Sequence, residues 1–323
     1  MKGSSYNIVN YAQRPSKAAE RKMLIEVLRE FCRTSNIDCY RYIGMGSIYY
    51  TDFALFHKEL GINDMISLEN KTDDRKRFEF NKPFKCIILE LGDSTEILPR
   101  LNWEKKSIVW LDYDETLQKY MFEDVEIVFR KLVKESFFFI TCNGSFPKFI
   151  IEKDNSYNVD LFKENFGDYV PFDLCEKDLT RNGGFKLIRR MINNQVEGVL
   201  AERNAILDED EKLVYKQLVF IKYKDNAPMV TLGGILIENK DLKDFEHQLR
   251  LKKIDFIRES DEEFSIESPL LTYKEVDLLN RNLPSSKVDF LEHEDLQFIP
   301  LESRESYFRI YRYFPYYVEV KEM

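Results

Sequence analysis

Long apolar runs are missing from this sequence. No stretch approaches the roughly 20 consecutive apolar residues that a membrane-spanning helix requires. Residues 1–22 (MKGSSYNIVNYAQRPSKAAERK) also lack the apolar segment of a secretory signal. We therefore expect a cytoplasmic protein that does not enter a membrane.

Closely spaced cysteines are missing as well. The chain has five cysteines, and no two of them form the C-x-x-C pair that is typical of zinc sites. We expect buried thiols in a reducing compartment, and no metal site. The five are Cys32, Cys39, Cys86, Cys142 and Cys175.

Positive charge is in deficit, because 48 Lys and Arg stand against 57 Asp and Glu, for a net charge of −9. This balance argues against broad binding to nucleic acid. Near the C-terminus, however, YFRIYRYFPYY interleaves aromatic residues with Arg309 and Arg312. Such a mixture stacks single-stranded bases in some proteins and forms protein interfaces in others. We keep nucleic acid as the weaker alternative. The segment either packs on the domain or forms an interface with a protein partner or a second copy.

Glycine is scarce, and two of the 12 glycines, Gly44 and Gly46, lie together in RYIGMGSIYYTDF. A dinucleotide fingerprint requires a third glycine three residues further on, where this chain has Tyr49. No G-K-[ST] follows, so a phosphate-cradling loop is missing too. These absences argue against a dinucleotide or ATP site. The pair is either a loop that approaches another cofactor or a tight turn in a core.

Helical and strand patterns do alternate through the first ~145 residues. Because the strand segments are continuously apolar, this alternation predicts an α/β fold with a parallel sheet covered on both faces. We expect helices over residues 17–33, 51–61, 71–81 and 115–135, and strands over residues 39–44, 64–70, 84–91, 106–114 and 136–143.

The second half of the chain is organised differently. An aromatic-rich insertion over about 143–180 precedes a helix near 184–205 and a hairpin over 215–237. Residues 1–240 are expected to form the α/β domain, and 241–323 an α+β extension with a capping box at Thr272–Glu275. The insertion either walls an apolar acceptor or forms a satellite core. Its aromatic residues are Phe146, Phe149, Tyr157, Phe162, Phe166, Tyr169 and Phe172.

Chemistry-bearing residues follow the expected strands in turn. Ligands of open parallel sheets bind beyond the carboxyl ends of the strands, so we expect these residues to share one edge of the sheet. They are Gly44, Met45, Gly46, Ser47, Glu69, Gly92, Asp93, Ser94, Asp112 and Asp114.

This order resembles the class I S-adenosylmethionine-dependent methyltransferases over roughly residues 20–237. The resemblance implies a doubly wound, mostly parallel, seven-stranded Rossmann-like sheet that closes with an antiparallel hairpin. It implies S-adenosyl-L-methionine as cofactor, with Gly44 to Ser47 beside it, Glu69 on its ribose and Asp93 and Ser94 near its adenine. Asp112 ends the fourth strand beside the cofactor.

The sequence departs from that family pattern at the first loop. Where the family has an acid two residues before the first glycine, this chain has Tyr42. Asp52 is either a displaced substitute for that acid or a charge that favours the start of a helix. Asp114 has two interpretations as well, as a site carboxylate or as the N-cap of the next helix.

The resemblance implies methyl transfer, in which the protein chiefly aligns acceptor, methyl group and sulfur. A hydroxyl acceptor also needs a base, for which the candidates are Asp112, Asp114 and His57. We expect a methyltransferase acting on a small molecule or protein. The alternative is a catalytically atypical S-adenosylmethionine-binding sensor or assembly subunit of a bacterial multi-protein system, and the weaker alternative is a nucleic-acid-modifying enzyme.

Overall fold

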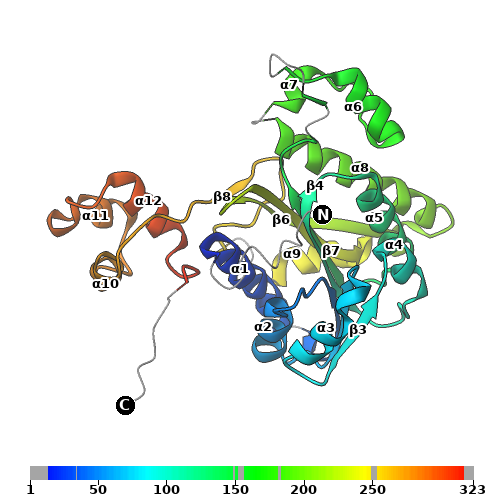
Figure 1. Cartoon of the computed structure of the whole chain (residues 1–323), viewed down its shortest axis with the longest axis horizontal. Coiled ribbons are helices and arrows are strands. Elements are labelled where there is room, and N and C mark those ends of the chain that lie inside the picture. The colour runs from blue at the N-terminus through cyan, green and yellow to red at the C-terminus, as the bar shows by residue number, and fades with distance from the viewer. Residues whose placement is uncertain are drawn as a thin grey trace.

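An eight-stranded sheet forms the centre of the structure, a computed structural model that describes residues 14–33, 35–147, 150–151, 156–180, 183–248 and 253–315. The strands lie in the order β3-β2-β1-β4-β5-β7-β6-β8. Figure 1 shows helices on both faces of this sheet. The strands are β1 (Arg41–Gly44), β2 (Asp64–Glu69), β3 (Ile87–Leu91), β4 (Ser107–Thr116), β5 (Ser136–Asn143), β6 (Leu213–Lys224), β7 (Pro228–Glu238) and β8 (Phe264–Ile266).

Strand direction matches the expected fold class. The first five strands pair in parallel, and β7 runs antiparallel to both β5 and β6. The α/β class and the closing hairpin are thereby confirmed. The sheet has eight strands where seven were expected, because β8 of the extension pairs in parallel with β6. With three residues, β8 is too short to show a periodic pattern.

The helices divide between the two faces of the sheet. On one face, α1 (Pro15–Cys32) packs beside α2 (Thr51–Leu60). On the other, α5 (Lys119–Lys131) packs beside α8 (Gly184–Asn204). The shorter helices that follow sheet strands are α3 (Arg75–Asn81), α4 (Ser94–Ile97) and α9 (Leu242–Gln248).

Alternation along β4 decides which way each side chain points. Ile108 and Trp110 are buried with α1 and α2, whereas Val109 and Leu111 are buried with α5 and α8. Because successive strand residues point to opposite faces, Asp112 continues the Ile108–Trp110 series. Its carboxylate therefore faces α1.

The insertion after β5 packs onto the α5–α8 side of the core and carries α6 (Val159–Phe166) and α7 (Glu176–Leu179). Tyr169 stacks on Phe122 of α5 with ring centroids 4.5 Å apart, and Phe146 meets Phe162 at 5.3 Å. These contacts favour the satellite-core interpretation. Phe172 is 95% exposed, and Phe149 lies outside the described residues.

The C-terminal helices enclose a hydrophobic cluster of their own. They are α10 (Tyr273–Arg281), α11 (Lys287–Glu292) and α12 (Leu301–Ile310). Figure 1 shows them beside the main body, beyond an extended segment that follows β8. The capping box at Thr272 is present, since its hydroxyl accepts from the backbone N–H of Glu275 and the Glu275 carboxylate accepts from the backbone N–H of Thr272. A domain boundary at residue 240 stays a prediction. Tyr316 and Tyr317 lie outside the described residues.

The cysteines depart from expectation. Among the described side chains the cysteines are unpaired, yet Cys39 and Cys175 are exposed and Cys86 is half-buried. Of these four cysteines, only Cys142 has the expected buried thiol, whose pKa burial raises to about 12. The Cys32 side chain lies outside the described ones. In the part of the chain that the structure describes, no helix is both long and apolar enough to cross a membrane.

Candidate functional site

The glycine loop after β1 packs tightly against its own surroundings. A Cβ on Gly44 would stand 2.5 Å from the Tyr42 hydroxyl, and one on Gly46 would stand 2.8 Å from Ser67 Oγ. Ser47 and Tyr50 adopt left-handed backbone angles, with φ of 47° and 48°. Internal packing therefore already requires both glycines. The loop is a tight turn in a core, and it lies at the carboxyl end of β1 as well.

Glu69, at the end of β2, faces this loop from the neighbouring strand. The backbone N–H groups of Ser47 and Gly46 favour its charged form and so lower its pKa. The Ser67 hydroxyl lies between the two elements, 3.5 Å from Glu69 Oε1 and 3.3 Å from the Gly46 nitrogen. Burial raises the pKa of Glu69 to about 7 despite these donors. Glu69 is therefore poised to change charge near neutral pH.

The turn after β3 brings Asp93 and Ser94 to the same edge of the sheet. Gly92 has a positive φ of 143°, and Asp93 is exposed at the start of α4. The Ser94 hydroxyl donates to Asp124 of α5, and so does the Tyr113 hydroxyl, at 2.6 Å. Burial raises the pKa of Asp124 to about 6, and its buried Oδ1 atom has no hydrogen-bond partner among the residues that the structure describes. Asp124 is a polar group that sequence analysis missed.

Asp112 and Asp114 both belong to β4, which continues to Thr116. The N-cap interpretation of Asp114 is therefore wrong, because α5 begins only at Lys119 and its N-cap is Gln118. Asp114 is exposed, and the Asp112 side chain is 17% exposed. The buried end of Asp112 accepts a 2.8 Å bond from Lys17 Nζ of α1. Burial raises the pKa of Asp112, while Lys17 opposes that rise.

A buried group of charges joins α1 to this edge. Lys17 bridges Asp112 and Glu20, and Arg21 pairs with Asp52 of α2. Each member is nearly inaccessible except Asp112. The first-turn position expected for Asp52 is confirmed, but its side chain turns inward to Arg21 instead of remaining in solvent.

Tyr42 occupies the place where the related family has an acid. Its ring packs against Phe53 and Phe56 of α2, with centroids 4.8 and 4.7 Å away. Burial, with the nearby carboxylates of Asp52 and Asp112, raises the pKa of Tyr42 well above its ordinary value. The position carries a neutral hydroxyl, and the negative charge stands next to it on Asp52.

His57 is not brought to this edge. It lies in the last turn of α2, about 9 Å along the axis from the start of the helix. Its Nδ1 is 2.9 Å from the carbonyl oxygen of Ile62, and its ring packs on Phe84 at 4.2 Å. The structure gives it a packing role near the start of β2.

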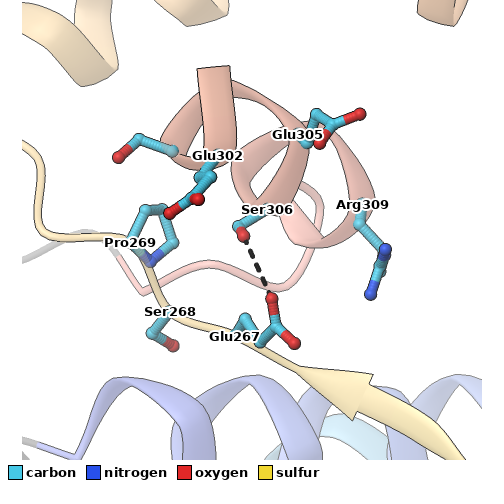
Figure 2. A pocket seen from close by; sticks show the side chains of 8 residues that line it. Glu267, Ser268, Pro269, Glu302, Glu305, Ser306 and Arg309 are labelled. Atoms are coloured by element: carbon cyan, nitrogen blue, oxygen red, sulfur yellow. Dashed lines mark hydrogen bonds between the residues drawn. The ribbon is translucent and has the colours of Figure 1, made fainter. Parts of the chain in front are cut away.

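Ligands of this fold class bind at the carboxyl edge of the sheet. Of two cavities, the first lies at the opposite edge, and the second lies at the carboxyl end of β8, several strands away from β1 and β2. One of about 480 Å³ is lined by residues including Cys39, Tyr40 and Lys106. The other, of about 280 Å³, separates α12 from residues 267–269, and Figure 2 shows Ser306 facing Glu267 across it. Neither is lined by a residue of the candidate site. In the described ranges, no three His, Cys, Asp or Glu residues are grouped to hold a metal ion.

Comparisons with known proteins place the chain in a family. A family model described as "Putative O-methyltransferase" matches residues 9–322. No curated protein sequence matches the chain.

Solved structures similar to this chain are distant in sequence. One is Trm1 from Pyrococcus horikoshii in complex with S-adenosyl-L-methionine, at 11% identity and a TM-score of 0.47, covering 76% of this chain and 61% of that one. Another is an O-methyltransferase family protein from Burkholderia thailandensis, at 10% identity and a TM-score of 0.32, covering 67% of this chain and 57% of that one. A third is human N-acetylserotonin methyltransferase in complex with S-adenosylmethionine, at 8% identity and a TM-score of 0.33, covering 68% of this chain and 56% of that one. The chain thus spans less than two thirds of each of these proteins.

The family match extends over nearly the whole chain, and the parallel sheet, closing hairpin and strand-end carboxylates agree with it. The chain therefore belongs to the "Putative O-methyltransferase" family, in agreement with the resemblance to S-adenosylmethionine-dependent methyltransferases seen in the sequence.

Proposed function

We propose that this protein transfers the methyl group of S-adenosylmethionine to an oxygen atom of a small-molecule or protein acceptor. The observation that carries the proposal is Glu69, a half-buried carboxylate at the end of β2 that Ser67 links to the backbone of the first loop. The family description supports oxygen as the acceptor atom.

The residues at the carboxyl edge suit this cofactor. A carboxylate offers about four lone-pair sites, so Glu69 accepts from ribose hydroxyls in addition to the donors of the loop. Asp93 is exposed beyond β3, where it is available to the adenine amino group, with Ser94 beside it. The loop of Gly44, Met45, Gly46 and Ser47 borders the methionine end.

When bound, S-adenosylmethionine would supply a methyl group on a positively charged sulfur, and this sulfur would keep the electron pair of the broken S–C bond as the leaving group. Asp112 then has two tasks at the end of β4. It orients the acceptor hydroxyl, and it takes the hydroxyl proton as the new O–C bond forms. Asp114, exposed two residues further along β4, lies at the rim of the same edge.

A calorimetric titration tests cofactor binding. Wild type should bind S-adenosylmethionine, and Glu69→Ala should bind it about 10- to 100-fold more weakly, as expected for lost bonds to a charged group. The matched control is Glu96→Gln, which removes an exposed charge from α4 near the same edge and should leave affinity unchanged. If wild type shows no binding, the cofactor assignment is wrong.

Turnover is the second test. Labelled S-adenosylmethionine is supplied with acceptor pools drawn from cell extract. Asp112→Asn should retain cofactor affinity and lose methyl transfer, because an amide cannot take the proton. Binding without turnover in every pool would instead favour a cofactor-binding sensor.

A further inference from the structure

An ammonium group of the chain itself fills an aromatic and acidic cage at the end of β4. Lys17 Nζ lies 2.8 Å from Asp112 Oδ1 and 2.7 Å from Glu20 Oε2. It stands over the rings of Trp110 and Tyr223, 4.4 and 5.7 Å from their centroids. Aromatic faces with carboxylates are the surroundings in which proteins bind organic cations.

The cage is built by distant parts of the chain. α1 supplies Lys17 and Glu20, β4 supplies Trp110 and Asp112, and β6 supplies Tyr223. A chain of hydrogen bonds across the sheet connects two members of the cage, Trp110 and Glu20. The Trp110 indole N–H donates to Thr141 at 3.0 Å, Thr141 and Thr231 are 2.7 Å apart, and Thr231 donates to Glu20. Since each hydroxyl has one proton, Thr141 is the donor to Thr231.

The N-terminus of α1 is held so that Lys17 enters the cage. No side chain of its own N-cap residue caps this helix. Asp225, in the turn between β6 and β7, accepts from the backbone N–H groups of Ser16 and Lys17 at 3.0 and 3.1 Å. Asp225 therefore holds the first turn of α1 against the sheet at Lys17. The Lys17 side chain points inward and is 3% exposed.

The charges around the cage favour a resident cation. Lys17 and Arg21 face three carboxylates, those of Glu20, Asp52 and Asp112. Burial alone lowers the pKa of Lys17, but Asp112 and Glu20 outweigh it and raise that pKa, so the lysine is charged. Asp112 joins the cage to the open edge of the sheet, since part of its side chain is exposed.

We propose that Lys17 is a specificity-determining residue, because it occupies the cation site beside Asp112 and so excludes amine acceptors in favour of hydroxyl acceptors. An incoming ammonium would find its carboxylate and aromatic partners taken, and would meet a like charge. A neutral hydroxyl escapes that repulsion and still reaches Asp112. This inference rests on the proposed function for the identity of the reaction, but the cage itself can be tested without turnover.

The test removes the Lys17 side chain from the cage and then adds a small organic cation that can take its place. Lys17→Ala removes Cγ, Cδ, Cε and Nζ, which n-propylammonium replaces atom for atom. Adding n-propylammonium should raise the melting temperature of Lys17→Ala saturably, by about 2 °C or more. Wild type and the exposed same-helix control Lys22→Ala should show no such rise, and 1-propanol at the same concentration should have no effect on any of them. A rise in wild type equal to that in the variant, or no rise in the folded variant, would overturn the proposal.

Lys17→Met keeps the inference testable if Lys17→Ala does not fold. Methionine fills the cage with an apolar chain, so this variant should gain no stability from n-propylammonium. Lys17→Ala refolded in the presence of n-propylammonium should then regain soluble protein, and failure to do so counts against the cage.

Acceptor preference provides the last readout. With labelled S-adenosylmethionine, wild type should methylate a hydroxyl pool and leave an amine pool unmodified, and Lys17→Ala should gain amine methylation. Preferential amine methylation by wild type would contradict the inference. If wild type fails to bind S-adenosylmethionine, the proposed function falls, whereas the n-propylammonium result still decides whether the cage is a cation site.

Discussion

At the scale of single residues, two ion pairs between the same helices differ in burial. Arg21 and Asp52 have side chains only 5% and 6% exposed, whereas Arg29 and Glu59 are 55% and 40% exposed. Removing one partner of a buried pair leaves an uncompensated charge in the interior. An exposed pair is solvated whether or not its partner is present.

This contrast predicts different costs for two similar changes. Asp52→Asn should lower the free energy of unfolding by about 3–5 kcal/mol, because Arg21 stays buried. Glu59→Gln should lower it by about 1 kcal/mol at most. Urea unfolding of both variants measures the difference, and equal effects would contradict the burial argument.

Glu69 predicts a pH dependence of stability. Its pKa in the folded protein is about 7, above an ordinary value of 4.5. Between these pH values the folded protein holds a proton that the unfolded chain has released, so stability falls as pH rises through this window. Between pH 5 and 8, wild type should lose about 1–3 kcal/mol more than Glu69→Gln. Urea unfolding at the two pH values tests this, and parallel losses would place the Glu69 pKa near its ordinary value.

At the scale of elements, the start of α1 depends on a carboxylate from another element. Asp225→Ala should lower the free energy of unfolding by about 1–2 kcal/mol through the lost cap. Because Asp225 also positions Lys17, Asp225→Ala should gain methylation of an amine pool, as expected for Lys17→Ala. Ser286→Ala is the control, since Ser286 caps α11 in the C-terminal cluster. It should cost similar stability and gain no amine methylation, and an equal gain in both variants would show that the Asp225 effect is general.

At the scale of the whole molecule, an extended segment joins β8 to the C-terminal helices. Leu270 in this segment is 99% exposed. The helices beyond it have their own hydrophobic cluster, and Ile310 and Tyr313 of the same region also contact the main core. The segment therefore offers a protease an accessible site between two packed regions.

Limited proteolysis should cut first near Leu270. The two fragments should elute together under native conditions, because Ile310 is fully buried and the Tyr313 hydroxyl donates to Glu26 of α1. S-adenosylmethionine affinity should be unchanged, since the proposed site lies at the ends of β1 to β4, several strands away from β8 in the sheet. Mass spectrometry of the cut protein, followed by size exclusion and calorimetry, checks all three points. Loss of cofactor binding on cleavage would show that the C-terminal helices support the site.

Local sequence patterns determined most of the fold. Continuous apolar strands alternating with amphipathic helices specify a covered parallel sheet, and the strand-end rule then places Gly44, Glu69, Asp93 and Asp112 along one edge. Each of these inferences needs only neighbouring residues, because side-chain periodicity is a local property. Lys17 and Arg21 also left a local signal, since they continue the stripe of Leu24 and Leu28 at helical spacing.

Only the tertiary structure decided which charged groups meet. Lys17 and Asp112 are 95 residues apart, and Ser16 and Asp225 are 209 residues apart. No local pattern encodes such pairs, because they form only when α1 docks across β4 and β6. The same packing leaves His57 at the far end of α2 and extends β4 past Asp114. A helix pattern predicts that a charge lies on an apolar face, but its partner depends on what packs against that face.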